Sequence, residues 1–329
     1  MLRLFYRPVN PAVAIPEKPH KRSLSWHLQQ FDYAWVLPWI GSLPPGLGRW
    51  ASQLRARINA RFSRDWAELS LGLPYITERT RVAAAELWPA MNAGQIVLER
   101  YKQTALEEWH GAMLQKKQLD ALPLDLSNLK QMLAKKERQR GLVVLTAHFD
   151  SFIVGMLGLG LCGQKTWVTT SNVYKNALVH PAVQTFFDQK YLAGNAFLNS
   201  GQFTHVETST RNLMKALARG ETLAVVADAP ASPDGSGVWL DWLGRPRKLA
   251  DGAIRMANKT ASQLCAMVCL TGQDGTVRWL CSDVYDPQLD PDAGAHCFAH
   301  LQQCILANPG RWWAAHLLND FPIRSATHG

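Results

Sequence analysis

The strongest constraint on this chain is a series of short, continuously apolar segments that alternate with helical patterns from residue 141 onward. The segments predicted as strands are residues 142–146, 166–170, 196–199, 222–227, 264–270 and 277–284. Helical patterns lie among them at residues 151–161, 177–192, 209–219 and 252–260. Strands without polar positions need cover on both faces, and strands joined through helices run parallel. The pattern therefore predicts an α/β fold with a mostly parallel central sheet flanked by helices, and 277–284 as an edge strand.

The length and apolar content suit one large domain with a core of its own. The chain has 329 residues, of which 47% are hydrophobic, and this composition excludes a disordered chain. The longest apolar candidate for a membrane span, residues 33–47, is broken by Pro38, Pro44 and Pro45. It also falls short of the roughly 18 residues that a transmembrane helix needs.

Targeting and cysteine patterns predict a cytoplasmic chain. Prolines and charges interrupt any apolar core of a secretory signal near the N-terminus. The six cysteines form no CxxC pair and mostly lie in apolar surroundings, which predicts buried free thiols. We therefore expect neither a metal site nor a cofactor.

The N-terminal part differs in composition from the rest. Residues 1–65 are predicted to form a basic, aromatic arm and an amphipathic helix; residues 66–329 are predicted to form the α/β domain, with its core at 141–320. A helical pattern at 50–66 carries a stripe of four apolar residues flanked by arginines: Trp50, Leu54, Ile58 and Phe62. Two interpretations stay open. The helix is either a monotopic membrane anchor or an ordinary surface helix packed on the core.

The charge balance limits the partners. Lys and Arg number 35 against 26 Asp and Glu, which gives a net charge of +9. Excess positive charge favours nucleic acid, an anionic membrane or an acidic protein. Because the basic residues are scattered and form no known binding motif, a nucleic-acid partner is not expected.

Polar residues follow the first predicted strand directly. His148 and Asp150 follow the end of this strand. In such sheets, binding and catalytic sites lie at the carboxyl ends of the parallel strands. A histidine there can act as general base when a carboxylate orients its other ring nitrogen. The alternative is a structural histidine followed by an aspartate that caps the next helix.

Several blocks around this site resemble a known family. In chain order they are Ala147-His148 at a strand end, Tyr174-Lys175-Asn176, residues 190–194 beginning with Lys190, a strand ending at Asp228, residues 238–246 with Arg245, and residues 308–316. Their order is similar to that in the lysophospholipid acyltransferase superfamily, in particular the late acyltransferases of lipid A biosynthesis of the lauroyl or myristoyl type. The likeness covers roughly residues 140–320.

The resemblance implies an acyltransferase. An acyl group would pass from an acyl-carrier-protein or CoA thioester to a hydroxyl or amine of a lipid, glycolipid or carrier-bound acceptor, with His148 as general base. Asp150 would be its catalytic companion. The residues implied to bind substrate are Lys175, Asn176, Lys190, Asp228 and Arg245.

One departure from the family pattern leaves the acid open. In the family, four residues separate the histidine from an acid. At the position of that acid this chain has Ile153. Asp150 could replace it through a local backbone change, or an acid from elsewhere such as Asp228 could do so. The third alternative is a catalytically degenerate relative that binds an acyl group or a partner protein without turnover.

The positive charge fits the partners that the resemblance implies. Acyl carrier proteins are acidic, and the inner membrane presents an anionic surface. We expect the protein either free in the cytoplasm or peripheral on the cytoplasmic face of the inner membrane.

Overall fold

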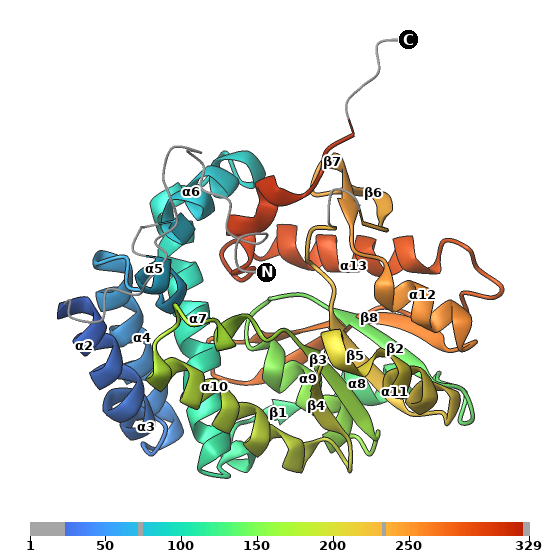
Figure 1. Ribbon diagram of the computed structural model, residues 1–329, viewed down its shortest axis with the longest axis horizontal. Coiled ribbons are helices and arrows are strands. Elements are labelled where there is room, and N and C mark those ends of the chain that lie inside the picture. The colour runs from blue at the N-terminus through green and yellow to red at the C-terminus, as the bar shows by residue number, and fades with distance from the viewer. Residues whose placement is uncertain (1–23, 72–74, 232–234, 325–329) are drawn as a thin grey trace.

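A central sheet covered on both faces organises the molecule (Figure 1). The computed structural model describes residues 24–71, 75–231 and 235–324, so most of the predicted N-terminal arm lies outside the described residues. Seven strands form the sheet in the order β1-β9-β8-β2-β5-β3-β4, parallel throughout except for the antiparallel β8–β9 pair. The strands of this sheet are β1 (Leu124–Asp125), β2 (Leu142–Thr146), β3 (Thr166–Thr170), β4 (Gln202–His205), β5 (Thr222–Val226), β8 (Gln263–Thr271) and β9 (Val277–Cys281).

Helices form the outer layers and an N-terminal bundle, which lies on the left of Figure 1. The bundle and the helices after it are α2 (Leu24–Phe31), a π-helical turn (Asp32–Val36), α3 (Leu37–Ile40), α4 (Pro45–Arg61), α5 (Trp66–Leu71), α6 (Tyr75–Leu87) and α7 (Ala93–Gln115). The remaining helices are α8 (Ser127–Ala134), α9 (Phe152–Leu161), α10 (Pro181–Gly194), α11 (Val206–Ala218), α12 (Gly252–Lys259) and α13 (Ala293–Ala307).

The central strand β2 shows why the apolar segments predict this architecture. Its Val143 and Leu145 belong to a core shared with α11, α12 and α13, while Leu142 and Val144 belong to a second core shared with α7, α8 and α9. Successive side chains of a strand point to opposite faces, so a strand buried on both faces has no polar position. The predicted α/β fold with a mostly parallel, helix-flanked sheet is confirmed.

Two strand predictions are wrong. Residues 196–199 do not pair: a 3-10 turn covers Asn195–Phe197, and the strand beside β3 is β4, which begins at Gln202. Asn199 and Ser200 have φ of 48° and 66°, so the chain must turn before it can run along β3. The strand at 277–284 is not at the edge, because the two-residue β1 pairs outside β9.

The sequence analysis also missed a hairpin that stands apart from the sheet. It consists of β6 (Val238–Trp242) and β7 (Arg245–Leu249), joined by a two-residue turn. Leu243 and Gly244 in this turn have φ of 53° and 80°, which is the left-handed geometry of a type I′ hairpin. An Asn-Gly turn would have signalled the hairpin, whereas a leucine gives no such signal.

Helix α4 packs with its polar side inward. Ser52, Arg55 and Asn59 are buried, and the Ser52 hydroxyl donates to the Ala105 carbonyl of α7 at 2.9 Å. The predicted apolar stripe of this helix is exposed instead. The helix is thus a surface helix that packs on α7, but through the side opposite the apolar stripe. The proposed boundary at residue 65 falls between α4 and α5 and stays a prediction.

The cysteines and the hydropathy of the helices were also considered in the sequence analysis. All six cysteines are free, four of them buried and two partly exposed. Across the described ranges, no helix combines the length and the hydropathy that crossing a bilayer requires.

Candidate active site

Two adjacent parallel strands bring His148 and Asp228 together. Thr146 at the end of β2 is in register with Val226 at the end of β5, and the Ala227 amide donates to the Thr146 carbonyl at 2.8 Å. His148 and Asp228 each stand two residues beyond these paired positions. Because the strands end side by side in the middle of the sheet, residues 80 apart in sequence meet at its carboxyl edge.

The Asp228 carboxylate holds both the ring and the backbone of His148. Nδ1 of His148 lies 2.8 Å from Oδ1 of Asp228, and the His148 amide donates to Oδ2 at 2.8 Å. The indole N–H of Trp312 donates to the same Oδ2 at 2.6 Å. Burial alone would raise the pKa of Asp228, but the charge and hydrogen bonds of His148, with the bond from Trp312, lower it below its ordinary value. The carboxylate is thus kept ionised and oriented.

Aromatic side chains border the His148 ring. Phe152 and Trp313 meet it edge to face, with ring centroids 5.3 Å and 5.0 Å away. The Trp313 amide donates to the His148 carbonyl at 3.0 Å, and the Asp150 amide donates to the Arg311 carbonyl at 2.9 Å. The C-terminal segment therefore pairs with the loop after β2 and fixes the histidine from the side opposite the sheet.

Asp150 points away from this pair. Its fully buried carboxylate accepts bonds from the amides of Ser151 and Thr271, from the Thr271 hydroxyl at 2.6 Å and from the Arg311 guanidinium at 2.7 Å. Its φ of 49° turns the chain between His148 and α9. In the structure the carboxylate that contacts the His148 ring is that of Asp228, the residue of the second alternative, whereas Asp150 links β8 to the C-terminal segment.

A cavity of about 470 Å³ opens in front of His148. This volume is within the range of ligand pockets, which are mostly apolar with a few polar groups. Apolar residues of β2, β5, α9 and α12 supply much of the wall, including Leu145, Val225, Phe152, Met156 and Met256. Phe152, Ile153 and Met156 of α9 line the cavity, while Val154 and Leu157 of the same helix are buried in the core.

A buried acid and a buried base form part of the same wall. Nζ of Lys190 lies 3.2 Å from Oε1 of Glu107, and both side chains are almost completely buried. Both residues line the cavity together with Ile153. Burial raises the pKa of Glu107 although Lys190 and the Ser151 hydroxyl oppose the shift. Ser151 donates to Glu107 at 3.0 Å and lies 2.6 Å from Nδ1 of His110. Glu107 escaped the sequence analysis because an acid within a long helix carries no local signal.

The remaining predicted site residues lie elsewhere. Lys175 forms an exposed ion pair with Asp188, and the Asn176 side chain accepts from the Leu178 amide at 2.9 Å. Arg245 is half exposed on the β6–β7 hairpin and pairs with Glu86 at 3.2 Å. None of the three is among the described residues that line the cavity. Their contacts with substrate stay a prediction.

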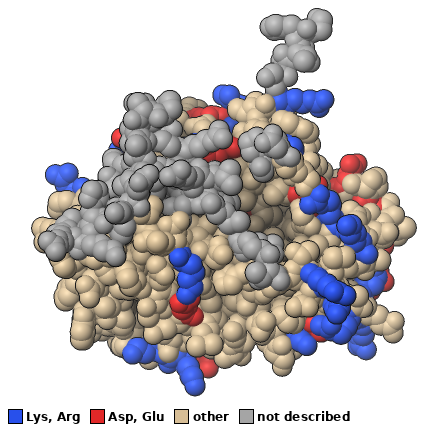
Figure 2. All heavy atoms as spheres, viewed as in Figure 1, with Lys and Arg blue, Asp and Glu red and all other residues tan. Residues whose placement is uncertain are grey.

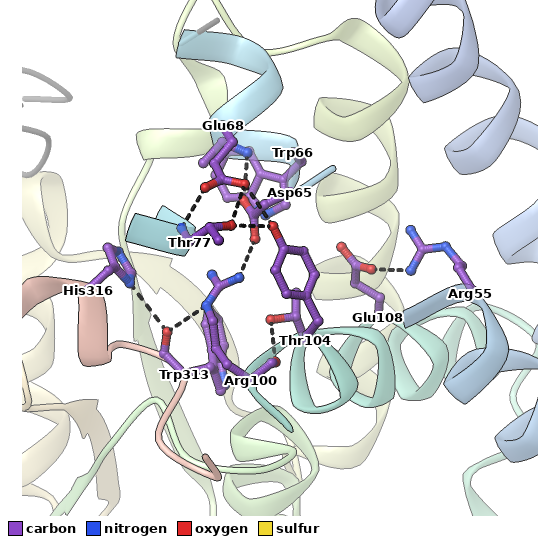
Figure 3. Close-up of polar contacts among 12 residues, drawn as sticks. Arg55, Asp65, Trp66, Glu68, Thr77, Arg100, Thr104, Glu108, Trp313 and His316 are labelled. Carbon is purple, nitrogen blue, oxygen red and sulfur yellow. Dashed lines mark hydrogen bonds and ion pairs between the residues drawn. The ribbon is translucent and has the colours of Figure 1, made fainter. Parts of the chain in front are cut away.

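A buried polar network ties the site to the N-terminal bundle (Figure 3). Arg100 donates to the Trp313 carbonyl at 3.2 Å and to the Asp65 carboxylate at 2.9 Å. The Nδ1 atom of His316, which also lines the cavity, lies 3.3 Å from the Trp313 carbonyl. Burial and the charges of Arg100 and Arg79 lower the pKa of His316 well below its ordinary value, so it is neutral at pH 7.

Trp312, Trp313 and His316 belong to the 308–316 block, which the sequence analysis singled out without assigning roles. Among the described residues, no three His, Cys, Asp or Glu side chains are grouped so that they could hold a metal ion.

A family model matches most of the chain. The family model for bacterial lipid A biosynthesis acyltransferases matches residues 38–316, which include the bundle from α3 onward, the whole sheet and the site. No curated protein matches the chain.

Proposed function

The chain belongs to the bacterial lipid A biosynthesis acyltransferase family, and from this premise we propose that His148 acts as general base in acyl transfer to a lipid acceptor. The enzyme class follows from the family. The proposal adds the donor, the residues and their roles.

The single observation that carries the proposal is the His148–Asp228 pair at the cavity. With Nδ1–H donating to Asp228, the other ring nitrogen, Nε2, is the one that can accept a proton. The ring is 29% exposed and lines the cavity, so an acceptor hydroxyl could approach it. The ionised Asp228 would stabilise the imidazolium that forms, as a carboxylate does in a Ser-His-Asp triad.

In the proposed step, the acceptor oxygen attacks the thioester carbonyl carbon while its proton passes to Nε2 of His148. The tetrahedral intermediate then collapses, the C–S bond breaks, and the proton on His148 goes to the departing thiolate. The products are an ester and a free thiol, and the histidine returns to its neutral form.

The cavity wall contains apolar side chains that could bury an acyl chain and a lysine that could stabilise negative charge. The apolar side chains of α9, β5 and α12 would bury the chain, and each methylene removed from water contributes about 0.8 kcal/mol. Of the residues predicted to bind substrate, Lys190 is the lysine in the wall, and it is the best placed to act on a developing negative charge. Lys175, Asn176 and Arg245 would have to act on parts of the donor or acceptor outside the cavity.

We propose a carrier-protein or CoA thioester as donor. The acceptor would be a lipid or glycolipid, and the protein would meet it as a peripheral protein on the cytoplasmic face of the inner membrane. We propose that the buried Asp228 carboxylate, two residues beyond β5, takes the place of the acid absent at Ile153, and its contact with the His148 ring supports turnover over the degenerate alternative.

The test compares His148→Ala and Asp228→Asn with wild type in a donor-consumption assay. The acceptor is lipid A precursor dispersed in detergent, and the donors are acyl-carrier protein and acyl-CoA. A positioned base contributes about 10²–10⁴ in rate, so the folded fraction of both variants should lose at least 100-fold in kcat.

Two further variants sharpen the test. Asp150→Asn should lower thermal stability and leave the folded fraction far more active than Asp228→Asn does, because Asp150 contacts Thr271 and Arg311 rather than His148. The exposed Asp283→Asn is the matched control for a lost carboxylate. Wild-type turnover that survives His148→Ala, or no turnover by the wild type with either donor, would contradict the proposal.

A further inference from the structure

The indole of Trp312 is buried against the Asp228 carboxylate. Its exposed fraction is 0%, and its ring belongs to the core that contains Val143 and Leu145 of β2. Its N–H donates to Oδ2 of Asp228 at 2.6 Å, which is shorter than the two contacts of His148 with the same carboxylate. Trp312 is not among the described residues that line the cavity. An effect of its N–H on the reaction therefore has to pass through Asp228.

The backbone on both sides of Trp312 fixes the position of the indole. Trp312 forms an antiparallel bridge with the completely buried Phe149, the residue that follows His148. A backbone hydrogen bond flanks the bridge on each side, and one of them joins the Trp313 amide to the His148 carbonyl at 3.0 Å. The segment that carries the indole is thus held in register with the loop that carries the histidine.

The two oxygens of the Asp228 carboxylate have different partners. Oδ2 accepts from the Trp312 indole and from the His148 amide, whereas Oδ1 faces Nδ1 of the His148 ring. The terminal torsion of an aspartate is broad, so other contacts must fix the plane of the carboxylate. The two donors on Oδ2 fix that plane with Oδ1 toward the ring. This arrangement keeps the proton on Nδ1 and leaves Nε2 as the acceptor.

We propose that Trp312 is a positioning residue for acyl transfer, the outer member of a chain of hydrogen bonds from Trp312 through Asp228 to His148. The inference rests on the proposed function for the role of His148 as base. Because α9 has Ile153 where the family has an acid, the orientation of the histidine depends on Asp228, and the indole holds that carboxylate in place.

The indole bond also acts on the protonation of His148. A donor to a carboxylate is held more strongly when no cation lies beside the carboxylate, so the indole favours the neutral histidine. Removal of the N–H should therefore favour the imidazolium and raise the pH at which His148 titrates. The other charged or titratable groups of the cavity wall, within the described ranges, are Glu107, Glu108, Tyr174, Lys190, Tyr191 and His316. They are the same in every variant below.

An isosteric replacement isolates the hydrogen bond. In the full-length protein, Trp312 is replaced by 3-benzothienylalanine, whose ring has sulfur in place of the N–H, and Trp312→Phe is the genetic counterpart. Nitrogen NMR of histidine-labelled protein follows the His148 ring, which is identified by the signals absent from His148→Ala. We expect the His148 titration midpoint and the acidic limb of kcat/KM to move to higher pH together.

The kinetic constants should separate positioning from binding. A hydrogen bond to a charged group contributes about a factor of ten or more to an equilibrium, so kcat at pH 7 should fall about tenfold. KM for the acyl donor should stay as in wild type, because Trp312 does not line the cavity. In an Asp228→Asn background, Trp312→Phe should have little further effect on kcat, since both residues act through one contact.

Trp88 provides the matched control. Its indole is also buried, and its N–H donates to the Leu306 carbonyl at 3.2 Å, within the described part of the chain but outside the cavity wall. The same isosteric replacement at Trp88 should leave the His148 titration, kcat and KM unchanged. Circular dichroism shows that each variant is folded.

Two outcomes would overturn the proposal. In the first, the His148 titration midpoint stays the same in both Trp312 variants, and the indole then only fills space. In the second, the Trp88 replacement shifts the titration equally, and the effect then belongs to any lost indole bond. Failure of the proposed function is a separate result, either no turnover by the wild type or turnover that survives His148→Ala. The NMR titration tests the role of Trp312 in either case.

Discussion

Asp150 and Asp228 lie near the same loop, but their carboxylates have different contacts. Asp150 and Asp228 are both fully buried, and Asp150 is the nearer of the two to His148 in sequence. The turn at Asp150 directs its carboxylate to Thr271 and Arg311, whereas Asp228 reaches the His148 ring from the neighbouring strand. Proximity in sequence was therefore a poor guide, because two residues of tight turn can reverse the direction of a side chain.

His110 gives a pH-dependent prediction. Burial, with a smaller contribution from Arg49, lowers its pKa from 6.5 to about 3, and its ring contacts the Ser151 hydroxyl. Between these two pH values the unfolded chain binds a proton that the folded protein does not, so stability falls as the pH drops below about 6.5. The loss is at most about 1.4 kcal/mol per pH unit.

His110→Asn removes one titrating group and should make the dependence of the free energy of unfolding on pH less steep between about 6.5 and 4, while His316, whose pKa is also lowered, keeps its own contribution. Denaturant unfolding at several pH values measures it, with the exposed His296→Asn as control. An equally steep dependence in His110→Asn would show that other groups cause the acid sensitivity.

Helix α9 needs glycines in order to pack closely against its neighbours behind the site. A Cβ atom at Gly160 would lie 2.0 Å from the Phe197 carbonyl oxygen, and one at Gly158 would lie 2.4 Å from the Trp279 ring. These glycines let the helix approach its neighbours closely enough to place Phe152 and Met156 at the cavity. The sequence indicated a glycine-rich apolar helix, but it could not indicate which neighbours the glycines admit.

We predict that Gly160→Ala lowers the free energy of unfolding by about 1–3 kcal/mol or more, because a backbone carbonyl cannot move aside as a flexible side chain can. Gly46→Ala in α4 is the control, since nothing lies within 4 Å of its added Cβ. It should be neutral or stabilising by up to about 1 kcal/mol. Equal denaturation midpoints for the two variants would contradict this account of the α9 packing.

Element prediction succeeded where the signal was local. β2, β5 and β8 are largely apolar runs and β3 is rich in β-branched residues, and each was predicted within a residue or two. β1 has only two residues and β4 reads as the polar sequence Gln202–His205, so neither carries a pattern of its own. Such strands form because a neighbouring strand offers unpaired backbone groups.

The molecule as a whole distributes its charge unevenly. Figure 2 shows Lys and Arg, with a few acids among them, gathered over the right side of the view, while the lower left, over α2 and α3 in Figure 1, is largely uncharged. A net charge of +9 with this asymmetry would steer an acidic donor to one side and leave the other for an apolar contact.

This distribution predicts that kcat/KM depends on salt concentration if the donor is an acidic carrier protein. Raising the salt from about 0.01 M to 0.1 M shortens the Debye length from about 30 Å to about 10 Å. If an acidic carrier protein is the donor, kcat/KM should fall about tenfold or more, while kcat at saturating donor should hardly change.

An uncharged acyl-N-acetylcysteamine thioester serves as the control donor, with the acceptor concentration fixed in neutral detergent. Its kcat/KM should be insensitive to salt. If both donors respond equally, the salt acts on the enzyme or the acceptor, and electrostatic steering of the carrier protein is excluded.

Local patterns in the chain are enough to predict the parallel sheet, the position of His148 at a strand end and the amphipathic stripe at 50–62. Each of these depends on consecutive residues, because hydrophobic periodicity and strand ends are local properties. The contact between Asp228 and His148 has no such local signal, since it depends on β5 lying beside β2 in register. The tertiary structure also decided that the stripe faces outward, because Arg55 finds its carboxylates, Asp32 and Glu108, on the inner side of α4. Pairings between residues far apart in the chain depend on which elements pack together, and that is settled only when the whole molecule folds.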